Sequence, residues 1–181
     1  MQRRIKTKDT VLQLPVRGTT VFPKYRLLVT LTSIIVTLDQ LTKVYIEKSF
    51  SLHETVKVIP NFFNITSVRN QGAAFGFLAD SSFREPFFIS ISVIAGLAIL
   101  WYIHHLPADQ KNFTLPLALI FAGAMGNLID RVRLGEVIDF IDVHWFGHHW
   151  PAFNVADSAI SVGVGLLFFF MWLHEKEKAK K

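Results

Sequence analysis

The chain has 181 residues and a formal net charge of +5, and 51% of its residues are hydrophobic. The hydrophobic residues come in long blocks, which is typical of a membrane protein and argues against a soluble globular domain. No cysteine is present, which excludes disulfides, a thiolate nucleophile and a thiolate metal site. Any catalysis must therefore use oxygen or imidazole chemistry.

Four apolar blocks predict four membrane-spanning helices. They cover residues 27–46, 86–103, 113–129 and 153–173. Each is close to the length of about 20 residues with which a helix crosses about 30 Å of hydrocarbon. Four crossings return both ends of the chain to one side, so the expected fold is an all-α membrane protein with a small external β element.

The basic residues predict the orientation of these spans. Lys and Arg are concentrated in segments 1–26 and 174–181, and fewer occur in the external segments 47–85 and 130–152. The positive-inside rule then places both tails in the cytoplasm, on either side of a membrane unit formed by residues 27–173. Topology explains part of the positive charge, and no nucleic-acid-binding motif is present. We expect the first span to be retained, because no small-residue cleavage site follows it.

The external segment after the first span has the pattern of a β-hairpin. Residues 55–59 and 63–68 are rich in β-branched side chains and partly alternate, and Pro60 and Asn61 separate them. Small residues follow Asn70, beginning with Gly72, and would allow a peptide or lipid backbone to approach closely. The segment is expected to form two external strands joined by a turn.

Polar side chains lie near the outer ends of three of the predicted spans. A charged side chain at the bilayer centre costs roughly 2.5–3.5 kcal/mol on insertion scales, so carboxylates kept near lipid indicate a functional site. Spacings of three and four residues put each group on one helix face. The groups are Asp39 and Lys43 in the first span, Asn127, Asp130 and Arg131 in the third, and Asn154, Asp157, Ser158 and Ser161 in the fourth.

Asp139 lies between the third and fourth spans, in a segment, 135–142, that we expect to be a loop re-entering the membrane surface or a short helix. Such a segment could bring Asp139 over Asp157. Repulsion between the two would leave one carboxyl protonated and one ionised, which is the condition for an aspartic protease dyad. Periodicity alone also allows Asp130 to pair with Asp157. Asp142 is expected to be a solvated loop residue.

Several of these residues also have a purely structural interpretation. Asp39 can pair with Lys43 one turn away, and Asp130 can pair with Arg131 at a helix end. Two asparagines, Asn127 and Asn154, could tie helices together by hydrogen bonds. Close helix packing is the expected role of Gly123, Gly126, Gly163 and Gly165.

Other functional classes fit the sequence less well. A zinc site at His144, His148 and His149 is disfavoured, because Gly147 interrupts the segment and no His-Glu-x-x-His motif exists. The neighbouring aromatic residues indicate a membrane-interface belt instead. A small transporter or proton-coupled channel would distribute its acids across the membrane, whereas these acids collect near one face. A purely structural subunit leaves the polar groups unexplained.

The ordered motifs resemble the five signature blocks of lipoprotein signal peptidase, the bacterial signal peptidase II. The resemblance runs from about residue 27 to residue 173, and only the long N-terminal tail departs from the family pattern. The motifs are Asp39-Gln40-Leu41-Thr42-Lys43, Asn70-Gln71-Gly72-Ala73-Ala74-Phe75, Gly126-Asn127-Leu128-Ile129-Asp130-Arg131, Val137-Ile138-Asp139-Phe140 and Phe153-Asn154-Val155-Ala156-Asp157-Ser158.

The resemblance implies an intramembrane aspartyl endopeptidase that removes signal peptides from diacylglyceryl-modified prolipoproteins, on the amino side of the modified cysteine. It implies a bacterial inner-membrane protein with its active site near the periplasmic face, sensitivity to globomycin-type inhibitors, and no metal or organic cofactor. It also implies that the external strands form an extracytoplasmic β-cradle over the membrane surface, which clamps the substrate. A monomer surrounded by membrane lipids is expected. By similarity, Asp139 and Asp157 would be catalytic, Asn70, Asn127, Arg131 and Asn154 would bind substrate, and Asp39, Lys43, Gly72 and Asp130 would support the site.

Overall fold

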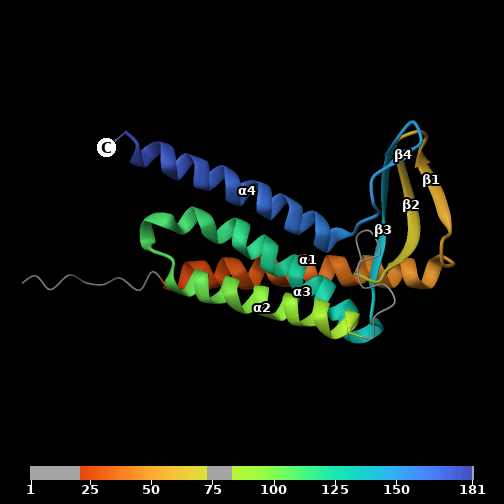
Figure 1. Ribbon diagram of the computed structural model, residues 1–181, viewed down its shortest axis with the longest axis horizontal. Coiled ribbons are helices and arrows are strands. Elements are labelled where there is room, and N and C mark those ends of the chain that lie inside the picture. Colours follow the sequence, from red (N-terminus) through yellow and green to blue (C-terminus); the bar gives the residue numbers. More distant parts are fainter. Residues whose placement is uncertain (1–20, 73–82, 181) are drawn as a thin grey trace, which may run out of the picture.

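A computed structural model describes residues 21–72 and 83–180. The tail before residue 21 and residues 73–82, which include part of the motif that begins at Asn70, lie outside the described residues. Four long helices and a small antiparallel sheet make up the described fold (Figure 1). The helices are α1 (Val21–Ser49), α2 (Arg84–His105), α3 (Thr114–Leu134) and α4 (Val155–Lys178), and a short 3-10 helix, η2 (Ala108–Phe113), precedes α3.

All four helices are long and apolar enough to cross a membrane. Each overlaps one of the four predicted spans and extends beyond it by a few residues at one or both ends. Helix α3 packs against α1, α2 and α4, and it is the most buried of the four. The helix that carries three of the predicted site residues is therefore the centre of the bundle.

The sheet has the strand order β1 (Thr55–Ile59), β2 (Phe63–Asn70), β3 (Val137–Trp145) and β4 (His148–His149), with every neighbouring pair antiparallel. It lies across one end of the bundle, and its strands run across the helix axes (Figure 1). Helix α1 begins and α4 ends at the opposite end of the bundle (Figure 1). The predicted hairpin of β1 and β2 is confirmed.

The prediction for residues 135–142 is wrong, because residues 137–142 are neither a loop nor a short helix but the first part of β3. Gly135, at φ +73°, ends α3 in a left-handed conformation that glycine adopts without strain. The chain then turns into a run of β-branched and aromatic residues that pairs with β2. That partner lies about 70 residues earlier in the chain, so local sequence could not reveal the pairing.

Ile46 of α1 packs in one apolar cluster with Ile138 and Phe140 of β3 and Ile65 of β2. This cluster fastens the sheet to the C-terminal end of α1, next to the polar residues of the bundle. The start of β3, which contains Asp139, therefore packs against the C-terminal end of α1.

Candidate active site

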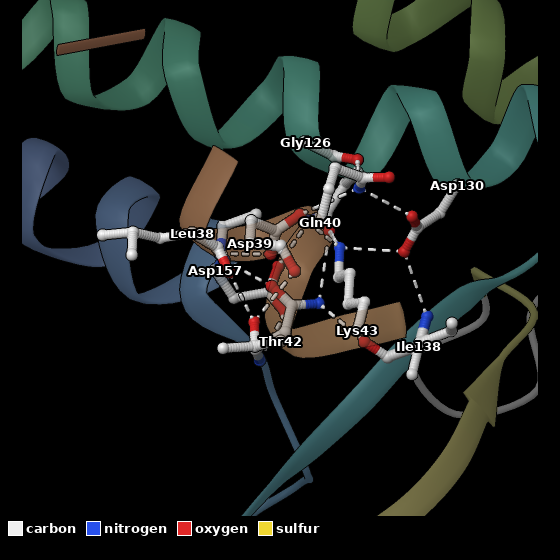
Figure 2. Close-up of polar contacts among 12 residues, drawn as sticks. Leu38, Asp39, Gln40, Thr42, Lys43, Gly126, Asp130, Ile138 and Asp157 are labelled. Carbon is white, nitrogen blue, oxygen red and sulfur yellow. Dashed lines mark hydrogen bonds and ion pairs between the residues drawn. The ribbon is translucent and has the colours of Figure 1, made fainter. Parts of the chain in front are cut away.

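Lys43 of α1 is the centre of a buried ion cluster, and only 1% of its surface is exposed. Its Nζ lies 2.8 Å from Asp39 Oδ2 and 2.8 Å from Asp130 Oδ2, and it donates a hydrogen bond of 2.9 Å to Asn127 Oδ1. An ammonium group has three donors, so all three are used. Figure 2 shows Lys43 reaching from α1 toward Asp130 of α3.

The prediction that Asp130 pairs with Arg131 is wrong, because the ion partner of Asp130 among the described residues is Lys43. Gln40 completes the cluster: its Nε2 donates to Asp130 Oδ1 at 2.9 Å and to Asp39 Oδ2 at 3.2 Å. Sequence reasoning did not single out Gln40, because its bond to Asp130 joins two helices whose relative rotation depends on packing.

The two carboxylates of this cluster also hold the backbone of neighbouring elements. Asp39 Oδ1 accepts a hydrogen bond of 2.9 Å from the backbone N–H of Ala156. Asp130 Oδ2 accepts one of 3.2 Å from the backbone N–H of Ile138, which Figure 2 also shows. Ala156 directly precedes Asp157, and Ile138 directly precedes Asp139. The ion cluster therefore fixes the backbone immediately before both of these aspartates.

Asn154 connects Asp139 and Asp157. Its Nδ2 donates to Asp139 Oδ1 at 2.7 Å, and its Oδ1 accepts a hydrogen bond from the backbone N–H of Asp157 at 2.9 Å. The Asp157 side chain in turn accepts a hydrogen bond of 3.3 Å from the Asn154 backbone, so the pair forms a capping box at the start of α4. One side chain thus begins the helix and joins the two acids.

Each of the two aspartates also accepts a hydrogen bond from a second asparagine. Asn70 Nδ2 donates to Asp139 Oδ2 at 2.8 Å, and Asn127 Nδ2 donates to Asp157 Oδ1 at 2.7 Å. Burial, and next the negative charge of Asp157, raises the pKa of Asp139 to about 7, against the opposing effect of the hydrogen bonds from Asn70 and Asn154. Asp139 can therefore hold a proton at neutral pH.

Arg131 and Gly72 border the same region. Arg131 lies over the ring of Phe88 at 5.5 Å from the centroid, and its hydrogen bond to Asn127 O is long, at 3.5 Å. The guanidinium of Arg131 is attracted by the negative charges of three nearby aspartates, Asp157, Asp139 and Asp130. A side chain at Gly72, whose φ is +92°, would meet the same Phe88 ring at 2.5 Å. Gly72 N also donates to Asn70 Oδ1 at 2.8 Å, which orients the Asn70 amide.

Asp142 differs from its prediction as a solvated loop residue. It is buried on β3, where it accepts one hydrogen bond of 2.7 Å from Asn64 Nδ2 and pairs with His149 Nδ1 at 2.7 Å. His149 stacks on His144 with ring centroids 4.6 Å apart. Across residues 21–72 and 83–180, no group of three His, Asp or Glu residues is arranged to hold a metal ion.

The structure thus brings all the predicted site residues to one place, at the sheet end of the bundle. Asp39, Lys43, Asp130 and Asn127 form the buried ion cluster, and Asp139, Asp157, Asn154 and Asn70 lie beside it. The alternative pairing of Asp130 with Asp157 finds no support here, because both oxygens of Asp130 are occupied by Lys43, Gln40 and the Ile138 backbone.

Known proteins resemble this chain over most of its length. A family model described as signal peptidase (SPase) II matches residues 31–173. The lipoprotein signal peptidase of Geobacter sulfurreducens is 55% identical over 159 residues, which cover 87% of this chain and 98% of that protein. That of Geobacter metallireducens is 49% identical over 158 residues, with the same coverage of 87% and 98%.

A solved structure shows the same fold. A bacterial membrane enzyme determined by the in meso method at 2.3 Å resolution superposes with a TM-score of 0.73 and 38% sequence identity, over 85% of this chain and 91% of that one. The transporter and structural-subunit alternatives are thereby excluded. The chain belongs to the signal peptidase II family, the bacterial multi-pass membrane proteases that remove signal peptides from prolipoproteins.

Proposed function

We propose that Asp139 and Asp157 are the catalytic dyad of this peptidase. The observation that carries the proposal is the position of Asn154, whose one side chain is bonded both to the Asp139 carboxylate and to the backbone of Asp157. The other two acids of the site, Asp39 and Asp130, are each bonded to Lys43 and to a backbone N–H. These two support the site, and the dyad is left to act on substrate.

The dyad works with one carboxyl protonated and the other ionised. The ionised carboxylate takes a proton from water, and the water oxygen attacks the carbonyl carbon of the scissile peptide bond. The protonated carboxyl gives its proton to the carbonyl oxygen, which forms a gem-diol. The C–N bond then breaks, and a proton passes to the leaving amine. The raised pKa of Asp139, about 7, supports a singly protonated pair at neutral pH.

The other polar residues divide into two roles. Asn154, Asn127 and Asn70 hold the carboxyl groups in place through the hydrogen bonds described above, and also line the substrate site. Arg131 binds the substrate backbone, because its single long hydrogen bond among the described residues leaves most of its five donors for a ligand. Gly72 keeps the approach to Asp139 free of a side chain that would displace Phe88.

The substrates are prolipoproteins with a diacylglyceryl-modified cysteine, cleaved on the amino side of that residue. The enzyme acts as a monomer in the inner membrane, and a globomycin-type inhibitor occupies the same site. Residues 27–173 form the peptidase unit, and the charged segments 1–26 and 174–181 orient it with both termini in the cytoplasm. The sheet and the dyad then lie near the periplasmic face.

The test is cleavage of a diacylglyceryl-modified prolipoprotein by the purified protein in detergent, with excess chelator. We expect the native chain to cleave, and Asp139→Asn and Asp157→Asn to lose activity by several orders of magnitude while remaining folded. Asp142→Asn is the matched control, because Asp142 lies three residues after Asp139 on the same strand and is bonded to other partners. Full activity in either dyad variant would refute the assignment of the dyad.

A further inference from the structure

Four aromatic side chains gather at the free end of the sheet, and we call them the hairpin tip: Phe62, Trp145, Phe146 and Trp150. They are 45%, 66%, 71% and 69% exposed, respectively. The backbone N–H of His144 donates to Phe62 O at 2.8 Å, and that of Trp150 donates to Val143 O at 2.9 Å. The β1–β2 turn and the β3–β4 turn therefore end side by side, with their aromatic residues outermost.

The turn between β3 and β4 holds Phe146 in a conformation that rarely suits it. Trp145 pairs with His148, so Phe146 and Gly147 form a two-residue turn, and their φ angles are +46° and +87°. Such turns strongly favour Asn-Gly, because a bulky side chain is strained at positive φ. Yet Phe146 occupies this position, and its exposed fraction is the largest among the exposed hydrophobic side chains of the described chain. Neither folding nor contact with water explains a phenylalanine there.

The hairpin tip extends sideways from the end of the bundle, beyond the helices and toward the surrounding lipid. The strands run across the helix axes, and the tip projects past α4 (Figure 1). Trp150 precedes the first residue of α4, Val155, by only five positions, a chain reach of at most about 18 Å. The tip therefore lies within about 18 Å of the end of α4 at which the sheet lies.

The composition of the tip fits one partner. Tryptophan is enriched where a bilayer meets water, because its ring is apolar and its N–H can bond to headgroups. Residues 60–62 and 145–150 contain no Asp or Glu, so no carboxylate opposes contact with phospholipid headgroups. Helix α4, which follows the tip in the chain, also exposes apolar side chains, among them Val162, Phe168 and Trp172.

We propose that the hairpin tip inserts into the boundary between headgroups and acyl chains of the nearer leaflet. Trp145 lies at the far end of β3, six residues and about 20 Å from Asp139. Lipid contact at one end of this strand fixes the height of Asp139 at the other. The tip is thus an anchor that sets the depth of the active site relative to the lipid-modified substrate.

The first test measures where the tip tryptophans lie. The chain has four Trp residues, and Trp101→Phe with Trp172→Phe leaves Trp145 and Trp150 as the emitters. In phosphatidylcholine vesicles, we expect lipids brominated near the headgroup to quench this emission several-fold more than lipids brominated near the chain end.

Equal quenching by aqueous iodide in vesicles and detergent, without quenching by either brominated lipid, would refute the proposal. Shielding that disappears when the protein is diluted with lipid would instead place a second copy of the chain on the tip. This readout is independent of cleavage, so its outcome is separate from that of the proposed dyad.

The second test uses the strain at Phe146. We expect Phe146→Asn to raise the unfolding temperature in detergent, because Asn suits a positive φ, and to leave cleavage in detergent unchanged. In vesicles the same variant should lose lipid quenching and cleave several-fold more slowly. Leu52→Asn is the control, because Leu52 is an exposed apolar residue of the external segment away from the tip. A more stable Phe146→Asn variant with native quenching and native activity in vesicles would refute the anchor.

Discussion

At the scale of single residues, the stability of the site depends on the positive charge of Lys43. Its ammonium group lies between two fully buried carboxylates, those of Asp39 and Asp130, and donates its third hydrogen bond to Asn127. Breaking a buried ion pair by removing one partner leaves uncompensated charge. The same carboxylates hold the backbone N–H groups of Ala156 and Ile138, so the loss would also loosen the segments that carry the dyad.

Lys43→Met, which keeps the length of the side chain but removes its charge, should therefore lower the free energy of unfolding by about 3–5 kcal/mol. Chemical denaturation in detergent measures the change. Lys48→Met is the control on the same helix, because Lys48 is exposed and should change stability by less than about 0.5 kcal/mol. Equal effects of the two substitutions would contradict the role of the ion cluster.

Asp139 gives the activity a predicted pH dependence. Its pKa of about 7 lies above the ordinary 3.8, so the folded protein holds a proton that the unfolded chain releases between these values. The contribution of Asp139 to stability is therefore fully present below pH 3.8 and lost as pH rises through about 7. Cleavage should decline on the alkaline side near the same pH, as the dyad becomes doubly ionised.

The measurements are the rate of cleavage and the unfolding temperature as functions of pH. Asp139→Asn should reduce the pH dependence of stability across this window, and Asp142→Asn, on the same strand, should leave the alkaline decline of the rate in place. A rate that stays constant well above pH 7 in the native chain would contradict a proton shared by this dyad. The midpoint belongs to the pair as a unit.

The sequence predicted which polar residues would meet but not how they would be bonded. Spacing along α1 and α3 placed Asp39 near Lys43 and Asn127 near Arg131, because helical periodicity is local. The bond from Lys43 to Asp130 joins two helices whose relative rotation depends on packing, so the sequence offered only the local pair with Arg131 as a possible partner for Asp130. The contribution of Gln40 was missed for the same reason.

At the scale of elements, the contact between α3 and α4 depends on two small residues. A methyl group at Gly123 would collide with the carbonyl oxygen of Ala156, one residue before Asp157. A methyl group at Gly163 would lie 2.8 Å from Pro116 O and 2.7 Å from Ile120. Gly165 has nothing within 4 Å of that position, so the prediction that it is a packing position is wrong. It lies on the same helix as Gly163, which makes it a matched control.

Gly123→Ala and Gly163→Ala should each destabilise the protein by about 1–3 kcal/mol through overpacking. Gly165→Ala should be neutral or slightly stabilising, because alanine is the better helix former. Thermal unfolding in detergent compares the three variants. Gly123→Ala should also reduce cleavage more than Gly163→Ala, because it displaces the start of α4. Three equal effects would show that these helices are not held by close contact.

The four helices could be predicted from the sequence, but the strand β3 could not. Long apolar blocks identify membrane helices because the thickness of the bilayer sets their length. The segment that contains Asp139 is short, and its strand pairing depends on β2, far away in the chain. Its alternation of Val, Ile, Asp and Phe fits a strand as well as a buried loop, and only the distant partner decides between them.

At the scale of the whole molecule, the charge distribution predicts the orientation of the protein in the membrane. The chain lacks cysteine, so single cysteines introduced into the native chain report the side of the membrane on which they lie. Asn61→Cys, in the exposed β1–β2 turn, should react in intact spheroplasts with a thiol reagent that cannot cross the membrane. Lys180→Cys, after the end of α4, should react only after the membrane is opened. The reason is that Lys and Arg at both tails are retained on the cytoplasmic side, which leaves the sheet outside. Each substitution is the control for the other, since both positions are exposed. Labelling of Lys180→Cys in intact spheroplasts, with Asn61→Cys protected, would invert the protein and place the sheet, the hairpin tip and the proposed dyad on the cytoplasmic side.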